Sequence, residues 1–322
     1  MTTKTLRKRP LSQVDVFTDT PYYGNALAVM HDGTDLSEAD LQRFAAWTNL
    51  AETTFLLPPT PEGAAAGADY RVRIFTTAYE MPFAGHPTLG SCHAWLQAGG
   101  QPKAGDTIVQ ECAVGLVRIR RTAGQGGERL AFAAPTLSRS TPEPAVVAQL
   151  AQALGITTDQ IVAAQALNNG PRHFGLLLDD PQTVLAIEPD REALRAWCQA
   201  TGNTGVGFAA PYVQDSGSAL IKRSNREARA FGTPSAPDST GVDLEVRFFA
   251  NDLVVNEDPI TGSFNASLSQ WLIADGHMPS RYTAAQGRCI GREGRVFIER
   301  DAQGQVWVGG QSVTCISGIV SA

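Results

Sequence analysis

The sequence predicts an α+β protein made of two pseudo-symmetric halves. Its 322 residues exceed the usual size of a single hydrophobic core, which favours two domains. Short alternating apolar stretches that indicate strands recur along the chain, and only a few segments have helical periodicity. A pattern of strand, loop and helix in the first half returns in the second half, as a duplicated domain would leave it.

Bulk composition excludes several classes of function. The chain has a net charge of -6, so it offers no attractive field for nucleic acid. Its apolar runs are too short to cross a bilayer, which predicts a protein without a membrane partner. The cysteines are scattered and form no C-x-x-C motif. We therefore expect buried thiols in a reducing cytoplasm rather than disulfides or a zinc site.

In the first half, most segments predict strands. Ser37 and Asp40 form a capping box at the start of a predicted helix. Residues 58–69, rich in Pro, Gly and Ala, indicate a loop. Pro87 precedes small and apolar residues that predict a short helix over residues 91–97. Strands are predicted at residues 11–17, 26–30, 53–57 and 70–76.

The second half alternates helices with strands. Amphipathic helices are predicted over residues 144–154 and 190–200. Residues 223–242 are polar and contain several Gly and Pro, which indicates a long surface loop. Strands are predicted at residues 174–178, 208–213 and 244–249.

One local pattern occurs in both halves. The segment V-R-I-F at 72–75 is followed by H-P-T-L-G-S at 86–91, and V-R-F-F at 246–249 is followed by D-P-I-T-G-S at 258–263. Each copy predicts a strand, an X-Pro-x-x-Gly-Ser turn and a helix, the second helix running over 263–273.

Two such turns facing each other would point two helix N-termini into one cleft. Free amides at a helix N-terminus favour an anion, most simply a carboxylate. His86 and Asp258 begin the two turns and are candidates for the chemistry, while each alone also fits an ordinary helix start.

Glu52 is the third candidate, because it stands at the entry of an otherwise apolar strand. If the fold removes this carboxyl from water, its pKa rises toward neutrality and it can both take and return a proton. A glutamate on the surface or on an edge strand is the alternative.

Several blocks along nearly the whole chain carry a family resemblance. The most specific are F-A-G-H-P-T at 83–88 and E-D-P-I-T-G-S at 257–263. In these blocks the chain resembles the PhzF-like family, named for an isomerase of phenazine biosynthesis, within the diaminopimelate-epimerase superfamily. Further matching blocks are V-D-V-F-T at 14–18, Gly24-Asn25, residues 49–55, R-I-F-T at 73–76, Q-G-R at 286–288 and V-G-G at 308–310.

The resemblance implies a fold and an activity. It implies two domains, residues 1–133 with 308–322 and residues 134–307, each a central helix wrapped by a curved, mostly antiparallel sheet. The active site would lie in the cleft between them. The implied protein is a homodimeric isomerase that needs neither cofactor nor metal and moves a proton between carbons of a small carboxylic or amino acid.

The resemblance also implies roles for single residues. Glu52 corresponds to the proton-transferring acid/base, and His86 and Asp258 to residues of the same pocket. The residues implied to hold the substrate are Asn25, Gly85, Thr261, Gly262 and Ser263. Ala51 departs from the family pattern, which usually has Ser before the glutamate, so the substrate carboxylate would lose one hydroxyl partner.

Other functions fit the residues less well. Epimerases and racemases of the superfamily use a cysteine at the start of each helix, and neither turn here contains one. A dehydrogenase would need a complete G-x-G-x-x-G motif, which the glycines at 202–207 do not form. A non-catalytic small-molecule-binding protein that retains the fold stays open as an alternative, as does an amino-acid epimerase.

Overall fold

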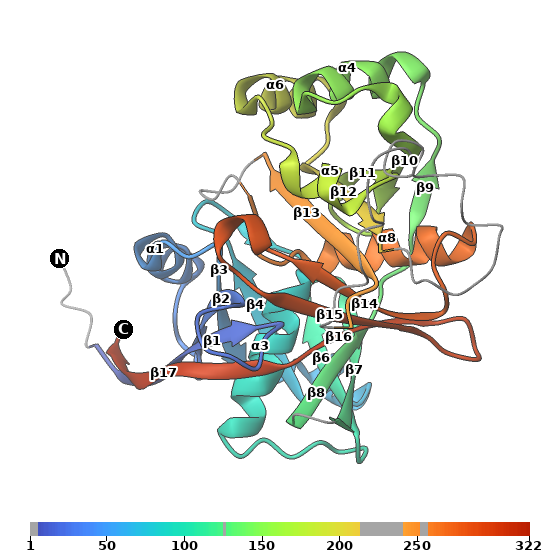
Figure 1. The fold of residues 1–322 in the computed structure, drawn as a ribbon. Helices are drawn as coiled ribbons and strands as arrows, with labels where there is room; N and C mark the ends of the chain where they lie inside the picture. The colour runs from blue at the N-terminus through green and yellow to red at the C-terminus, as the bar shows by residue number, and fades with distance from the viewer. Residues whose placement is uncertain (1–5, 125–126, 213–240, 252–256) are drawn as a thin grey trace. The chain divides into compact units, whose positions relative to one another are not determined.

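A computed structural model describes residues 6–124, 127–212, 241–251 and 257–322 (Figure 1). The chain forms two compact units, Met1–Ala133 with Gly309–Ala322 (unit 1) and Ala134–Val308 (unit 2). Both units combine helices with a sheet, so the predicted α+β class is confirmed. The surface loop expected at 223–242 lies outside the described residues, apart from its last two.

Unit 1 is built on a mostly antiparallel sheet. Its strands pair in the order β17, β1, β2, β3, β4, β6, β7, β8, and β5 extends the edge of β4. Among the strand pairs of unit 1 that the structure describes, β2–β3 and β4–β6 are the parallel ones. The strands are β1 (Lys8–Val16), β2 (Asn25–Met30), β3 (Glu52–Leu57), β4 (Tyr70–Phe75), β5 (Glu80–Met81), β6 (Thr107–Cys112), β7 (Gly115–Gly124), β8 (Gly127–Ala133) and β17 (Ser312–Ser321).

The helix α3 (Gly85–Gln97) lies at the centre of unit 1 and packs against strands from both edges of its sheet (Figure 1). Small residues allow this close approach. A Cβ atom on Gly90 would lie 2.6 Å from Leu27 Cδ2 and 2.8 Å from Val16 Cγ2. The helix begins six residues before the predicted residue 91, because proline is tolerated in a first turn where no amide bond is lost.

Two shorter helices cover other parts of unit 1. The helix α1 (Glu38–Thr48) begins with the predicted capping box, in which Ser37 and Asp40 bond reciprocally. The expected loop at 58–69 is partly wrong, since it contains the helix α2 (Pro61–Ala65). The Thr60 hydroxyl accepts a bond from the Gly63 amide, and Pro61 fits the first position of this helix.

Unit 2 repeats the order of pairing found in unit 1. From β1 to β7, successive strand pairs alternate between antiparallel and parallel, beginning and ending with an antiparallel pair. The strand pairs from β10 to β15 alternate in the same order. The duplication suggested by the sequence pattern is therefore present in the topology of the sheets. The strands are β9 (Ser138–Ser140), β10 (Ile161–Asn168), β11 (Arg172–Leu178), β12 (Gly205–Pro211), β13 (Leu244–Ala250), β14 (Arg281–Gln286), β15 (Gly294–Arg300) and β16 (Val306–Gly310), the last crossing into unit 1.

The helix α8 (Gly262–Ala274) corresponds in unit 2 to α3 in unit 1. Each of the two helices lies in the chain between two strands that pair in parallel, β13 and β14 or β4 and β6. Both helices have 13 residues, and both are buried over most of their length. The other helices that the structure describes in unit 2 are α4 (Pro144–Leu154), α5 (Pro181–Ala186), α6 (Arg191–Thr201) and the short 3-10 turns Thr158–Gln160 and Arg288–Ile290.

The first residues of α3 and α8 show that the repeated sequence pattern was aligned incorrectly between the two halves. H-P-T-L-G-S at 86–91 is not a turn but the first part of α3, whereas D-P-I-T-G-S at 258–263 precedes and enters α8. Gly85 and Gly262 are the first residues of α3 and α8. When these two residues are aligned, E-M-P-F-A-G at 80–85 corresponds to E-D-P-I-T-G at 257–262. His86 thus corresponds to Ser263. His86 and Asp258 do not occupy equivalent positions in the two units.

The expectation of buried cysteines is wrong for two of the five. Cys289 is exposed on a 3-10 turn, and Cys315 is half-buried on the edge strand β17. The other three thiols are buried and free. Among the described residues, no helix is long and apolar enough to span a membrane, and no three His, Cys, Asp or Glu side chains gather as metal ligands.

The close approach of α3 to the sheet can be tested at Gly90. We expect Gly90→Ala to lower the free energy of unfolding by about 1–3 kcal/mol, because the added methyl group overlaps Leu27 and Val16. Alanine has the better helix propensity, so a stabilised variant in urea denaturation would contradict the packing. Gly318→Ala is the matched control, since a Cβ atom there meets nothing within 4 Å.

Candidate functional site

Glu52 is the first residue of β3, a strand covered by helices on both faces. Side chains alternate along the strand, so Glu52 and Thr54 face α3 while Phe55 faces α1. The Ser91 hydroxyl on α3 donates to Thr54 Oγ1 at 2.8 Å, which fixes this side of the strand. Glu52 is only 6% exposed, so the alternative of a surface glutamate is excluded.

His86 lies opposite Glu52 in the first turn of α3. Its Nε2 atom is 3.4 Å from Glu52 Oε2, and both side chains are buried. Burial lowers the pKa of His86 from 6.5 to about 3, because the cationic form is removed from water. The imidazole is therefore neutral at physiological pH.

Asn25 determines where the single imidazole proton sits. Its Nδ2 atom lies 3.2 Å from His86 Nδ1, and an amide nitrogen can only donate. His86 Nδ1 is thus the acceptor, which places the ring proton on Nε2, facing Glu52. Asn25 on β2 bonds His86 on α3, and His86 Nε2 lies 3.4 Å from Glu52 Oε2 on β3, so three elements of unit 1 bring these polar groups together.

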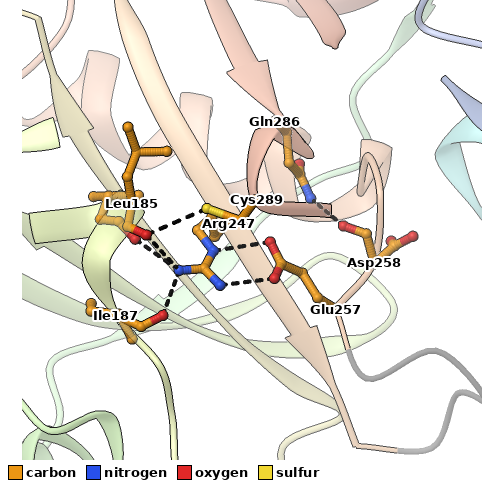
Figure 2. A network of polar contacts seen from close by, with 8 residues as sticks. Leu185, Ile187, Arg247, Glu257, Asp258, Gln286 and Cys289 are labelled. Atoms are coloured by element: carbon orange, nitrogen blue, oxygen red, sulfur yellow. Dashed lines mark hydrogen bonds and ion pairs between the residues drawn. The ribbon is translucent and has the colours of Figure 1, made fainter. Parts of the chain in front are cut away.

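Unit 2 contains a second polar group around Asp258. The Thr261 hydroxyl donates to Asp258 Oδ2 at 2.6 Å. Gln286 Nε2 donates to the Asp258 carbonyl oxygen at 3.0 Å (Figure 2). Gln286 Oε1 accepts bonds from the Thr261 amide at 3.1 Å and from Asn265 Nδ2 at 2.9 Å. All four side chains are buried, so the network holds the entry of α8 in one conformation.

The start of α8 has no side-chain cap. Its N-cap residue is Thr261, whose hydroxyl bonds Asp258 instead of the first-turn amides. The N-cap of α3 is Ala84, which cannot form such a bond. Each unit therefore presents a helix N-terminus whose first amides, at Gly85 and His86 or at Gly262 and Ser263, suit an anionic group.

A buried ion pair precedes Asp258 in the chain. Arg247 Nε and Nη2 donate to the two oxygens of Glu257 at 2.9 and 2.8 Å. Its Nη1 atom donates to carbonyl oxygens at the end of α5, that of Val184 at 3.0 Å among them. The bond to the Ile187 carbonyl oxygen measures 2.6 Å (Figure 2). The planar guanidinium group thus binds one carboxylate through two of its nitrogens and carbonyl oxygens through the third, which the ammonium group of a lysine could not reproduce.

The structure brings the predicted site residues together in two groups. Unit 1 gathers Asn25, Glu52, Gly85 and His86, and unit 2 gathers Asp258, Thr261, Gly262 and Ser263. The side chain of Asn25 is hydrogen-bonded to His86, and that of Thr261 is hydrogen-bonded to Asp258. Sequence reasoning assigned no role to Arg247, Glu257 and Gln286; an arginine within the apolar strand segment at 244–249 was the one local signal.

A further buried histidine was also missed. His173 lies on β11, and its ring meets Phe248 and Phe264 edge to face at 5.0 and 5.8 Å. Burial lowers its pKa to about 3, so it is a neutral part of the aromatic core beside α8.

Residues 14–318 match the PhzC-PhzF family, described as phenazine biosynthesis-like proteins. The chain belongs to this family. It is 30% identical to antisense-enhancing sequence 1 of Schizosaccharomyces pombe, over 97% of this chain and 99% of that protein. It is 29% identical to trans-2,3-dihydro-3-hydroxyanthranilate isomerase of Pseudomonas aeruginosa, over 91% of this chain and 90% of that protein.

Solved structures share the fold. A phenazine biosynthesis protein of the PhzF family from Bacillus anthracis has a TM-score of 0.77 at 18% identity, over 98% of this chain and 99% of that one. A hydroxyproline epimerase from Agrobacterium vitis has a TM-score of 0.54 at 15% identity, over 98% and 93% of the two chains. The expected diaminopimelate-epimerase-like fold is confirmed.

The protonation state of His86 can be read directly. We expect its Cε1–H resonance in an NMR titration to stay at the position of a neutral imidazole from pH 8 to pH 5, since its pKa is about 3. Comparison with His86→Gln assigns the signal. A midpoint near the usual value of about 6.5 would contradict the buried, neutral ring.

The same shift has a consequence for stability. Between its unfolded pKa of 6.5 and its folded pKa of about 3, His86 binds a proton only in the unfolded chain. Its contribution to the free energy of unfolding is therefore complete above about pH 6.5 and is lost as the pH falls toward 3.

Proposed function

We propose that this protein is an isomerase that moves a proton between carbon atoms of a small carboxylic or amino acid, without a cofactor. The observation that carries the proposal is the buried carboxylate of Glu52 with the neutral imidazole of His86 at 3.4 Å. Membership of a family with named isomerases supports the same reaction class.

In the proposed reaction, the ionised Glu52 removes a proton from an activated C–H bond and becomes a carboxylic acid. The electron pair of that bond shifts along the unsaturated substrate, and Glu52 returns the proton to another carbon. The enzyme ends as it began, so the step needs no second reactant. A proton transfer of this kind contributes about 10²- to 10⁴-fold to a rate.

His86 has a positioning role in this proposal and does not relay the proton. An imidazole whose pKa is about 3 holds no second proton to give at neutral pH. Its Nε2 atom instead lies 3.4 Å from Glu52 Oε2, close enough for the ring to limit where the carboxylate can move. Asn25 supports this orientation from the opposite ring nitrogen.

Substrate binding is assigned to the uncapped helix starts. Amides of Gly85 in unit 1 and of Gly262 and Ser263 in unit 2 suit a carboxylate, and Asp258 suits an amino or hydroxyl substituent. Ala51 supplies no hydroxyl beside Glu52, which favours a substrate different from that of relatives with serine there. Trans-2,3-dihydro-3-hydroxyanthranilate, named for a relative, is the first compound to test.

A protein that binds a small molecule without reacting is the second candidate. The match to antisense-enhancing sequence 1, whose name states no isomerase activity, keeps it in view. A pure binder has no use for a carboxylate buried beside an imidazole, because such a group costs stability.

The decisive variant is Glu52→Gln, which keeps the shape of the side chain but cannot take a proton. With trans-2,3-dihydro-3-hydroxyanthranilate and a panel of unsaturated carboxylic and amino acids in deuterated water, NMR follows the loss of C–H signals. We expect exchange by the wild type and a fall of at least about 100-fold in the variant.

The exposed glutamate Glu62 offers a matched control, and Glu62→Gln should exchange deuterium like the wild type. Undiminished exchange in Glu52→Gln would remove Glu52 from the mechanism. Binding of a panel compound without any exchange would favour the second candidate.

We also propose that the protein is a cytoplasmic homodimer. In unit 1, Ile319 of β17 is 70% exposed, which suits burial against a second chain. Light scattering after size-exclusion chromatography should give twice the mass of the chain, about 69 kDa from 34.3 kDa. A mass of one chain at micromolar concentration would exclude the dimer.

A further inference from the structure

An arginine–glutamate pair occurs at the same place in both units. Arg73 and Arg247 are the second residues of the repeated segments V-R-I-F and V-R-F-F. Arg247 binds both oxygens of Glu257, and Arg73 likewise binds both oxygens of Glu80, with Nε to Oε1 at 2.7 Å. The pairing is therefore part of the duplicated plan and not a chance surface contact.

The two glutamates also hold the same place relative to the central helices. Glu80 and Glu257 each come five residues before the first residue of α3 or α8. Each forms an antiparallel bridge to the last residue of its repeated segment, Glu80 with Phe75 and Glu257 with Phe249. Both ends of each ion pair thus lie on segments that are bridged to each other shortly before the helix begins.

A second anchor lies between each glutamate and its helix. Ile260 is fully buried, and a Cβ atom on Gly294 would lie 2.1 Å from Ile260 Cγ1. In unit 1 the matching residue is Phe83, which is buried edge to face on Phe132 at 5.6 Å. The short segment before each helix start is consequently held at both ends, by charge and by packing.

The unit 2 pair is tied to a further element. The Nη1 atom of Arg247 also donates to carbonyl oxygens at the end of α5, which the helix itself leaves without partners. Glu257 is followed directly by Asp258, whose amide donates to the Phe248 carbonyl oxygen at 2.9 Å. A shift of Glu257 would therefore be passed on to Asp258 and to the first turn of α8.

We propose that these Arg–Glu pairs are positioning devices, and that Arg247 and Glu257 set the place of Asp258 and of the uncapped start of α8. For the role of Asp258 in the reaction this inference rests on the proposed function. Arg247 and Glu257 are positioning residues that act through their neighbours.

The variant Arg247→Lys distinguishes a positioning role of the ion pair from a role in charge neutralisation alone. It keeps one positive charge beside Glu257, but it cannot bind both carboxylate oxygens and the α5 carbonyl groups together. If the pair only neutralises charge, Arg247→Lys behaves like the wild type. If the pair fixes geometry, the segment that follows it loosens although the charge is kept.

Amide hydrogen exchange followed by mass spectrometry measures this without any substrate. In Arg247→Lys we expect exchange of residues 257–265 to speed up at least about tenfold, with residues 144–154 (α4) of the same unit unchanged. Deuterium incorporation into the compound of the panel that the wild type exchanges should fall at least about tenfold in the same variant.

Arg139 offers a matched control at the other end of α8. It binds both oxygens of Asp275, the C-cap residue, at 2.6 Å, so the chemistry is the same while the helix start is remote. Arg139→Lys should leave both the exchange of residues 257–265 and the reaction rate within about twofold of the wild type.

Unchanged exchange of residues 257–265 in Arg247→Lys would overturn the inference, and so would faster exchange with an unaltered reaction rate. Should this variant not fold, Arg73→Lys tests the device at the more exposed pair, where residues 80–88 should exchange at least about threefold faster. Glu52→Gln should leave amide exchange of residues 257–265 unchanged, so loss of the proposed reaction and loss of positioning give different results.

Discussion

Each unit of this protein depends on a helix that begins in the interior. The first turn of any helix leaves backbone amides without internal partners, and in α3 and α8 no side chain caps them. Such groups are costly when buried, so the surrounding structure must hold them where a partner can reach them. These first-turn amides are held in place by the sheets around the helices, by the segments that lead to them and by the neighbouring polar groups.

The two units meet the constraint with the same scaffold but with different side chains. In unit 1 the second helical residue is His86, whose neutral ring faces Glu52 and is oriented by Asn25. In unit 2 the second helical residue is Ser263, and the charged group is Asp258, which lies before the helix and is bound by Thr261. Duplication has thus kept the geometry of the helix start while its chemistry diverged.

Burial has opposite consequences for the groups involved. It removes the second proton of His86 and leaves a donor of fixed direction, which suits a residue that orients a carboxylate. Arg247 and Glu257 form a bidentate ion pair in the interior, where the pair and the α5 carbonyl groups replace the lost water. A neutral donor and a compensated ion pair are two ways to place polar groups inside the protein without a mobile charge.

The family, the α+β class, most strands and the capping box at Ser37 followed from the sequence, since they depend on local periodicity and on motifs of adjacent residues. Glu52, His86 and Asp258 were also identified as candidates from their blocks. The start of α3 and the register of the repeat were misplaced, because a proline and small residues read locally as a turn. Only tertiary structure decided that Glu80 matches Glu257, that Asn25 sets the tautomer of His86, and that Arg247 holds the segment before Asp258. Those relations join residues from different strands and helices, and their energies arise only when the folded chain brings the partners together out of water.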